Sequence, residues 1–267
     1  MNMDSFTNEK DFKLLVQDRY TFAVLDRILR GDCDLIRTDH ENLILCHSAA
    51  RFPVWIWTPD GCADAVKEKT WNLAAECRPL ADGYRFNMKY ELADYFMQKA
   101  EQNGQKVGIH MQLFAYDCPS PVIPDRPTDG SLYRCTPDDT EEVADLIALF
   151  YKEIGENPPP REYCVEKAQE HIGKNEFFFW KDAADKTVAC CSYRINQELA
   201  SLASVFTLPE RRRHYYAQHL VYEVTKLVSD MGYMPMLYTD ANYIASNACY
   251  EKIGYILRGK LCTVSAG

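Results

Sequence analysis

An amide and a phenol stand three residues apart in the stretch TDANYIASNACYEKIGY, Thr239–Tyr255. If this stretch forms a helix, Asn247 and Tyr250 share one face of it, because residues three apart are neighbours on a helix surface. The stretch follows a short apolar run that predicts a strand, and open α/β sheets bind ligands where their parallel strands end. The spacing therefore places an amide that can hold a ligand beside a phenol that can donate a proton.

The same stretch carries signals for the limits of its helix. Asn242 is a favourable N-cap residue, and Gly254 predicts a left-handed residue at the C-terminal end. Ala245, Cys249 and Ile253 lie four apart, which predicts one buried stripe. Taken singly, an exposed amide and a buried tyrosine have bland structural explanations, so the functional interpretation depends on the pair.

A second stretch with chemical potential is VFTLPERRRHYYA, Val205–Ala217. It predicts a strand that ends through Thr207, a turn at Pro209 and a helix that starts near Tyr215. The first N–H groups of a helix lack backbone partners and lie at the positive end of its dipole, which suits a pyrophosphate. On residue types alone, a solvated basic turn is the commoner explanation of three successive arginines.

The elements around both stretches predict an α/β protein. The C-terminal part reads as two helices, three strands, a helix, a strand, a helix and a strand. These elements cover, in order, residues 136–155, 160–173, 176–181, 187–195, 199–208, 218–232, 235–240, the helix of the first stretch and 255–264. The N-terminal part predicts helices at 12–29, 60–77 and 90–104 and strands at 42–48, 53–57 and 106–116.

A seam separates these parts. The segment YDCPSPVIPDRPTDG, Tyr116–Gly130, is rich in proline, aspartate and glycine and has no periodicity. It predicts a linker between an N-terminal α/β domain at 1–125 and a C-terminal domain at 131–267. Helix-then-strand order in the N-terminal part echoes the C-terminal part, so it is interpreted as a degenerate copy of the same fold that lacks the phosphate turn and the Asn-x-x-Tyr pair.

Composition limits the classes of partner. The 267 residues carry a formal net charge of −9, which argues against non-specific binding to nucleic acid or an anionic membrane. No apolar run approaches the ~18 residues of a membrane span, and MNMDSFTNEKDF lacks the pattern of a signal peptide. The 11 cysteines form no pair at zinc-ligand spacing. We expect a cytoplasmic protein with reduced thiols and without a metal.

Both stretches together resemble the GNAT superfamily of N-acetyltransferases. The resemblance covers roughly residues 132–267 and depends on VFTLPERRRHYYAQHL and ANYIASNACYEKIGY in that order. It implies an acyl-CoA N-acyltransferase fold, a mixed central sheet flanked by helices, with acetyl-CoA as cosubstrate. The residues it assigns to coenzyme binding are Val205, Phe206, Thr207, Arg212, Arg213, His214, Tyr215, Tyr216, Ala217, Asn242 and Asn247; it assigns Tyr250 as the acid that protonates the departing thiolate.

Two positions depart from the family pattern. Tyr215 stands where the pyrophosphate loop has its middle glycine, which lets the backbone approach phosphate. The strand at 199–208 has no glutamate to act as general base. Glu198, Asp240, a water relay and an amine that arrives neutral all remain candidates for that role.

The resemblance implies transfer of an acetyl group to a primary amine of a small molecule or peptide by direct attack on the thioester. Two alternatives come from other classes. One is a CoA-binding regulatory module without turnover, and the other is a structural adaptor with two domains. Coenzyme binding would separate the adaptor from the rest, and turnover would separate the enzyme from the regulatory module.

Overall fold

The computed structural model describes residues 3–31 and 33–267, and the chain divides into two compact units. Unit 1 comprises Met1–Ala115, Thr239–Asn242 and Leu257–Gly267, and unit 2 comprises Tyr116–Tyr238 and Tyr243–Ile256. The predicted linker, residues 116–130, belongs to unit 2 in this division, and the end of the chain belongs to unit 1 because the last strand, β11 (Ile256–Ala266), pairs with β4 (Phe86–Met88).

The strands of unit 1 follow the order β1-β2-β3-β4-β11-β5. The pairs β1–β2, β2–β3 and β4–β11 are antiparallel, and β3 and β4 run parallel with Val54 opposite Phe86. The elements, in chain order, are α1 (Glu9–Leu14), α2 (Ala23–Arg30), β1 (Leu35–Thr38), β2 (Ile44–His47), β3 (Val54–Trp57), α3 (Asp64–Cys77), the 3₁₀ turn η1 (Leu80–Asp82), β4, α4 (Tyr90–Gln102) and β5 (Val107–Asp117).

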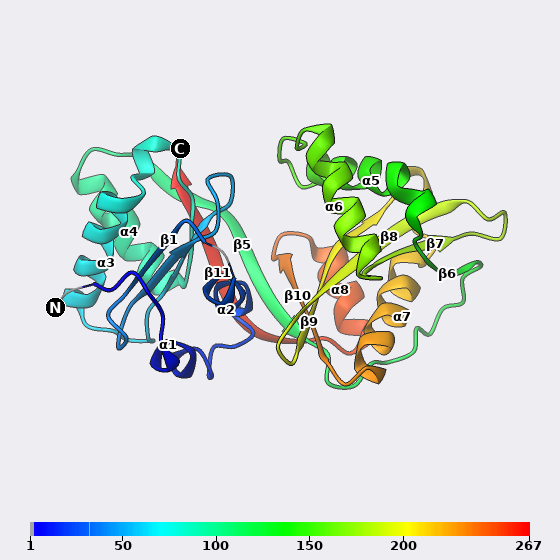
Figure 1. Cartoon of the computed structure of the whole chain (residues 1–267), viewed down its shortest axis with the longest axis horizontal. Helices are drawn as coiled ribbons and strands as arrows, with labels where there is room; N and C mark the ends of the chain where they lie inside the picture. The colour runs from blue at the N-terminus through cyan, green and yellow to red at the C-terminus, as the bar shows by residue number, and fades with distance from the viewer. Residues whose placement is uncertain (1–2, 32) are drawn as a thin grey trace. The chain divides into compact units, whose positions relative to one another are not determined.

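The core of unit 1 explains its layers. Side chains alternate along a strand, so Val54 and Ile56 of β3 face one side and join α3 and α4 in one apolar cluster. Trp55 faces the other side, where its ring contacts Phe22 at the start of α2. Helices α1 and α2 therefore cover one face of the sheet, and helices α3 and α4 cover the opposite face (Figure 1).

Unit 2 repeats this order of elements and has a further strand, β6, before its first helix. Its sheet has the order β10-β9-β8-β7-β6, antiparallel except for the parallel pair β9 and β10. Its elements are β6 (Ser131–Arg134), η2 (Pro137–Asp139), α5 (Thr140–Glu153), α6 (Arg161–Gly173), β7 (Phe177–Lys181), β8 (Thr187–Asn196), β9 (Leu199–Thr207), η3 (Pro209–Arg211), α7 (Tyr216–Asp230), β10 (Met234–Asp240) and α8 (Ile244–Ile253).

Helices α5 and α6 cover one face of the unit 2 sheet, and α7 and α8 cover the other (Figure 1). Each unit thus contains two helices, three antiparallel strands, a helix, a parallel strand and a helix in the same order. The mixed α/β fold predicted from the sequence is confirmed, and unit 1 is a second copy of the order of elements in unit 2.

Two predicted helix limits in unit 1 are wrong. The helix at 12–29 is two helices, α1 and α2, and Asp18 between them accepts hydrogen bonds from Trp57 Nε1 (2.8 Å) and Lys89 Nζ (2.7 Å). The helix at 60–77 begins only at Asp64, because Gly61 takes a left-handed turn with φ of 63°.

Candidate coenzyme site

Strand β9 carries the first predicted residues and leaves its parallel neighbour before it ends. Within the described residues, β10 pairs with β9 from Met234 opposite Leu199 to Leu237 opposite Leu202, whereas β9 runs on to Thr207. On its other edge the register with β8 shifts around Ser204, whose φ is 51°. A β-bulge of this kind redirects the strand. Residues 203–207 therefore present one edge that an extended ligand can pair with.

The three predicted residues of this strand point to two faces. Phe206 is buried in the cluster with α5 and α6, so Val205 and Thr207 point to the face that carries α7 and α8. Thr207 Oγ1 is buried and has no hydrogen-bond partner in the described part of the chain. An unsatisfied buried hydroxyl is costly, and a polar ligand that binds here would relieve that cost.

The turn after β9 retains the backbone shape that a glycine would provide. Tyr215 has φ of 64° and ψ of 6°, which is left-handed, and Arg213 two residues earlier has φ of 68°. The left-handed conformation costs a residue with a Cβ roughly 1–2 kcal/mol. Tyr215 is 45% exposed. Tyrosine at this position therefore adopts, at an energetic cost, a conformation that glycine adopts freely.

The turn feeds directly into the N-terminus of α7. Tyr215 is the N-cap residue, its side chain makes no capping hydrogen bond, and the first turn contains no acidic residue. Of the predicted residues, His214, Tyr215, Tyr216 and Ala217 all lie in this segment. Because the first N–H groups of a helix have no partners within it, the start of α7 offers donors and a positive dipole end to an anion.

The three arginines of the turn have different surroundings. Arg211 lies 3.6 Å from Asp182, and Arg212 pairs with Glu153 at the end of α5 with an N–O distance of 2.8 Å. Arg213 is exposed and forms no ion pair among the residues that the structure describes. Arg213 is therefore the cation of this turn that is available to a phosphate without displacing a carboxylate.

Helix α8 brings Asn247 and Tyr250 together as predicted. Both are buried, with 8% and 7% of their surfaces exposed, and they share a face with Ile253. The predicted stripe is wrong at Ala245, which is exposed. The amide and the phenol occupy the buried face themselves, which is why a purely apolar stripe is not observed.

The surroundings of Tyr250 keep its phenol protonated. Burial raises the pKa of Tyr250 far above its ordinary value, so the phenol is protonated throughout the neutral range. Its ring packs against Tyr255 with centroids 5.9 Å apart, and the Tyr255 hydroxyl shares a 2.7 Å hydrogen bond with Thr225. The second tyrosine is thereby tied into α7.

Asn242 does not cap α8, so this part of the prediction is wrong. The N-cap residue is Tyr243 without a side-chain cap, and Asn242 belongs to unit 1, where its N–H donates to Asp240 Oδ1 at 2.9 Å. Glu198 precedes the first residue of β9, six residues before Ser204. At ~3.3 Å per residue it lies about 20 Å from the bulge, too far for direct proton transfer there.

Sequence reasoning missed the residues that contact the turn from the linker. Thr128 Oγ1 donates to His214 O at 2.7 Å, and Tyr216 OH donates to Asp129 Oδ1 at 2.8 Å. Thr128 and Asp129 both lie in the tetrapeptide PTDG, whose sequence predicts only a turn. The only indication of these contacts in the sequence was that the polar residues Thr128 and Asp129 directly precede Gly130.

The corresponding turn of unit 1 is built differently. In this turn the Gly61 N–H donates to Glu91 Oε2 at 3.0 Å, and Lys67 Nζ lies 2.8 Å from Glu91 Oε1. Counting from the first residue of each helix, Ala93 and Phe96 of α4 occupy the places of Asn247 and Tyr250 in α8. The second copy thus has a carboxylate at the turn and two apolar residues in place of the amide and the phenol.

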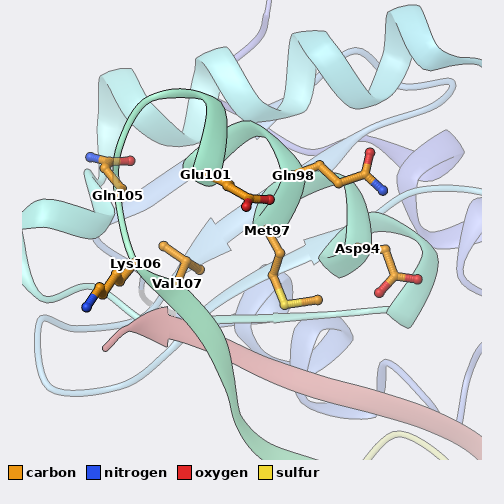
Figure 2. Close-up of a pocket in the computed structure, with 7 residues that line it drawn as sticks. All are labelled: Asp94, Met97, Gln98, Glu101, Gln105, Lys106 and Val107. Atoms are coloured by element: carbon orange, nitrogen blue, oxygen red, sulfur yellow. The ribbon is translucent and has the colours of Figure 1, made fainter.

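Other features of the described residues lie away from these elements. No group of three metal-binding side chains and no helix able to cross a membrane occurs among them. A pocket of about 450 Å³ lies on unit 1, lined by α4 and the loop before β5. Figure 2 shows Asp94 and Glu101 on the helix and Lys106 on the loop. The predicted site residues belong to other elements.

Comparison with known proteins gives a family match and several structural likenesses. Residues 183–264, which include both sequence stretches, match the FR47-like protein family. No curated protein sequence matches the chain.

Solved structures match almost the whole chain. A GNAT-family acetyltransferase from Colwellia psychrerythraea is 10% identical, covers 99% of this chain and 98% of its own, and has a TM-score of 0.59. A Drosophila protein is 13% identical over 99% and 98%, with a TM-score of 0.70. A GCN5-related N-acetyltransferase from Sphaerobacter thermophilus is 12% identical over 98% and 94%, with a TM-score of 0.69. At these identities the likeness shows the fold, and the predicted GNAT-like fold is confirmed.

Proposed function

Because the chain folds as GNAT acetyltransferases do, we propose that it is an acetyl-CoA-dependent N-acetyltransferase whose coenzyme site is in unit 2. The observation that carries this proposal is the uncapped start of α7 after a turn that keeps a left-handed residue at Tyr215. A tyrosine is strained in that conformation, and strained residues are found at binding sites. The helix N-terminus beside Tyr215 is suited to bind the coenzyme pyrophosphate.

Three features of unit 2 fit the parts of the coenzyme. The N–H groups from His214 to Ala217 would bind the pyrophosphate, with Arg213 as the available cation. The β9 edge from Val205 to Thr207 would pair with the pantetheine arm, and Thr207 Oγ1 would gain a partner there. Asn247 would hold the coenzyme near its sulfur end.

The chemistry is a direct transfer. The amine nitrogen forms a bond to the acetyl carbon, the bond between that carbon and sulfur breaks, and the sulfur receives a proton. Tyr250 would donate a hydrogen bond or that proton to the departing sulfur, because burial keeps its phenol protonated in the neutral range. The amine loses a proton to Asp240, to a water relay, or before it arrives.

The acceptor class is a primary amine of a small molecule or a peptide. The net charge of −9 is compatible with a cationic acceptor. A CoA-binding module without turnover remains the alternative that assays must separate from the enzyme.

Thermal unfolding with acetyl-CoA and with acetyl-pantetheine tests the proposal. At 100 times its Kd, a ligand that binds the native state alone stabilises it by ~2.7 kcal/mol, so acetyl-CoA should raise the Tm by several degrees. Acetyl-pantetheine lacks the pyrophosphate and should do much less. An unchanged Tm with saturating acetyl-CoA, and no heat in calorimetry, contradicts the proposed function.

Turnover is measured separately with a panel of amines and a free-thiol readout. Release of CoA that depends on one amine supports the enzyme. Binding of acetyl-CoA without release of thiol for any amine of the panel would favour the regulatory module.

A further inference from the structure

The linker that precedes β6 makes three hydrogen bonds to the strained turn and the first residues of α7. Thr128 Oγ1 donates to His214 O (2.7 Å), and Tyr216 OH donates to Asp129 Oδ1 (2.8 Å). One turn further along α7, His219 Nε2 is 2.7 Å from Arg126 O. The residues on both sides of Tyr215 are thus fastened to one short segment, residues 126–129, which is named the brace below.

The brace is itself fixed to β7 and the loop after it. Asp129 O accepts from Trp180 Nε1 at 2.9 Å, and Asp129 Oδ2 accepts from the N–H of Ala183 at 3.0 Å. Gly130 has φ of 87°, and a Cβ there would lie 2.0 Å from Lys181 O. The chain can approach β7 this closely only with glycine at that position.

The negative charge of the brace is that of the Asp129 carboxylate, which accepts two hydrogen bonds. Hydrogen bonds from the Ala183 N–H and the Tyr216 hydroxyl lower the pKa of Asp129, so its carboxylate is ionised at neutral pH. Both donors keep it directed at these two groups.

The hydrogen bonds between the brace and His214 and Tyr216 fix the residues on both sides of the strained residue Tyr215. Tyr215 adopts its left-handed conformation with its ring 45% exposed and without a capping hydrogen bond from its side chain. Strained backbone conformations persist where the surroundings over-determine them. A glycine would need no such support, because it adopts positive φ without a steric cost.

We infer that the brace is a positioning device: Thr128 and Asp129 hold the turn at Tyr215 in its left-handed form, and thereby replace the missing glycine and aim the first N–H groups of α7. The binding consequence depends on the proposed coenzyme site, whereas the conformational consequence does not. Thr128 and Asp129 act through the turn and touch no reacting atom.

The test couples the brace to the residue it supports. Thr128→Val removes the hydroxyl and keeps the shape, and it is made in the parent and in Tyr215→Gly. In the parent it should weaken acetyl-CoA binding about threefold to tenfold, as expected for one lost hydrogen bond, with kcat at saturating coenzyme changed less than twofold. In the Tyr215→Gly background the same change should weaken binding less than twofold. Thr128→Ser should restore parent affinity.

A matched control is available on the same unit. Thr140 Oγ1 also donates to a backbone carbonyl at 2.7 Å, that of Pro137, and it too is an exposed contact. Thr140→Val should leave acetyl-CoA affinity at the parent value in both backgrounds. A loss equal to that of Thr128→Val would mean that general destabilisation is the cause, and the inference would fail.

Hydrogen exchange without ligand separates this inference from the proposed function. In the parent, Thr128→Val should speed exchange of the amides of residues 209–220, and in Tyr215→Gly it should not. If the protein binds no acetyl-CoA but the exchange results appear as stated, the proposed function fails and the brace stands. If Thr128→Val changes exchange equally in both backgrounds, or in neither, the brace is wrong whatever the coenzyme does.

Discussion

At the scale of single residues, the chain contains its own comparison for the two side chains assigned to chemistry. Asn247 and Tyr250 lie buried on α8, and the matching places on α4 hold Ala93 and Phe96, both fully buried. The scaffold can therefore fill these places with apolar groups. The polar atoms of the pair in unit 2 need another explanation than packing, and the ligand binding and proton donation proposed above would supply it.

Tyr250→Phe should lower turnover ~10²–10⁴-fold with acetyl-CoA affinity nearly unchanged. The reason is that the change removes the acidic hydroxyl and keeps the ring, and general acid catalysis typically contributes a factor of this size. Steady-state kinetics with the accepted amine gives turnover, and calorimetry gives affinity.

Tyr255→Phe is the control for that change. Its hydroxyl is bonded to Thr225 and its ring contacts Tyr250. This variant should lose about 0.5–1.5 kcal/mol of stability and retain turnover. Equal turnover of Tyr250→Phe and the parent across the pH range would assign Tyr250 to the core alone.

At the scale of elements, a histidine fastens α1 to the sheet of unit 1. His40 Nδ1 lies 2.8 Å from Asp11 Oδ2, and Nε2 lies 3.0 Å from Asp4 Oδ2. Asp11 is fully buried and also accepts from Thr38 Oγ1 at 2.6 Å. Burial opposes a charge on His40, but the hydrogen bonds and charges of Asp11 and Asp4 outweigh it and raise the pKa of His40.

This arrangement predicts a dependence of stability on pH. The pKa of the folded state is above the ordinary value near ~6.5, so the folded state binds the proton more tightly. The stabilisation is complete below about pH 6.5 and is lost as the pH rises through the raised pKa. His40→Asn removes the cation and tolerates the left-handed backbone found here (φ of 59°).

Urea unfolding of the parent and His40→Asn measures this effect. The difference in their free energy of unfolding should be about 1–3 kcal/mol at pH 6 and should shrink as the pH is raised to 9. A difference that stays constant over that range would show that His40 is not charged in the folded state.

The sequence predicted the elements of unit 2 better than their capping and contacts. Strong apolar periodicity identified the helices α5–α8 and the strands β7–β10 but not the edge strand β6, and Gly254 has the predicted left-handed conformation with φ of 104°. The cap at Asn242 failed because α8 begins at Ile244, with Tyr243 as its N-cap residue, one residue later than the predicted cap. The residue at which a helix begins is the least certain part of a pattern of residue types.

The candidate site was predictable in part for the same reason. The turn and the pair on α8 are local in sequence, and the structure brings Asn247 and Tyr250 onto one buried face. The brace was not predictable, because it joins Thr128 to His214 over a separation of 86 residues. The exclusion of Glu198 likewise required the length and direction of β9.

At the scale of the whole molecule, two copies of one order of elements differ at the place where an anion would bind. In unit 1 the carboxylate of Glu91 accepts the hydrogen bond from the Gly61 N–H, and Asp60 and Asp64 lie at the same turn. A pyrophosphate would meet like charges there. In unit 2 the corresponding helix start has no acid in its first turn.

We therefore expect one acetyl-CoA per chain. Calorimetry of the intact protein should give a stoichiometry near one, and Arg213→Ala should weaken that single event. Glu223→Ala, which removes a charge from the same helix away from its first turn, should not. A stoichiometry of two, with one event insensitive to Arg213→Ala, would mean that unit 1 also binds the coenzyme.

The pairing of β11 with β4 has a consequence for how the protein is made. Thr263 Oγ1 donates to Asn87 Oδ1 at 2.7 Å, and 176 residues separate the two. Ribosomes add ~5–20 residues per second, so Asn87 is synthesised roughly 10–35 s before its partner exists. Unit 1 is begun first and can be completed only after all of unit 2 has been synthesised.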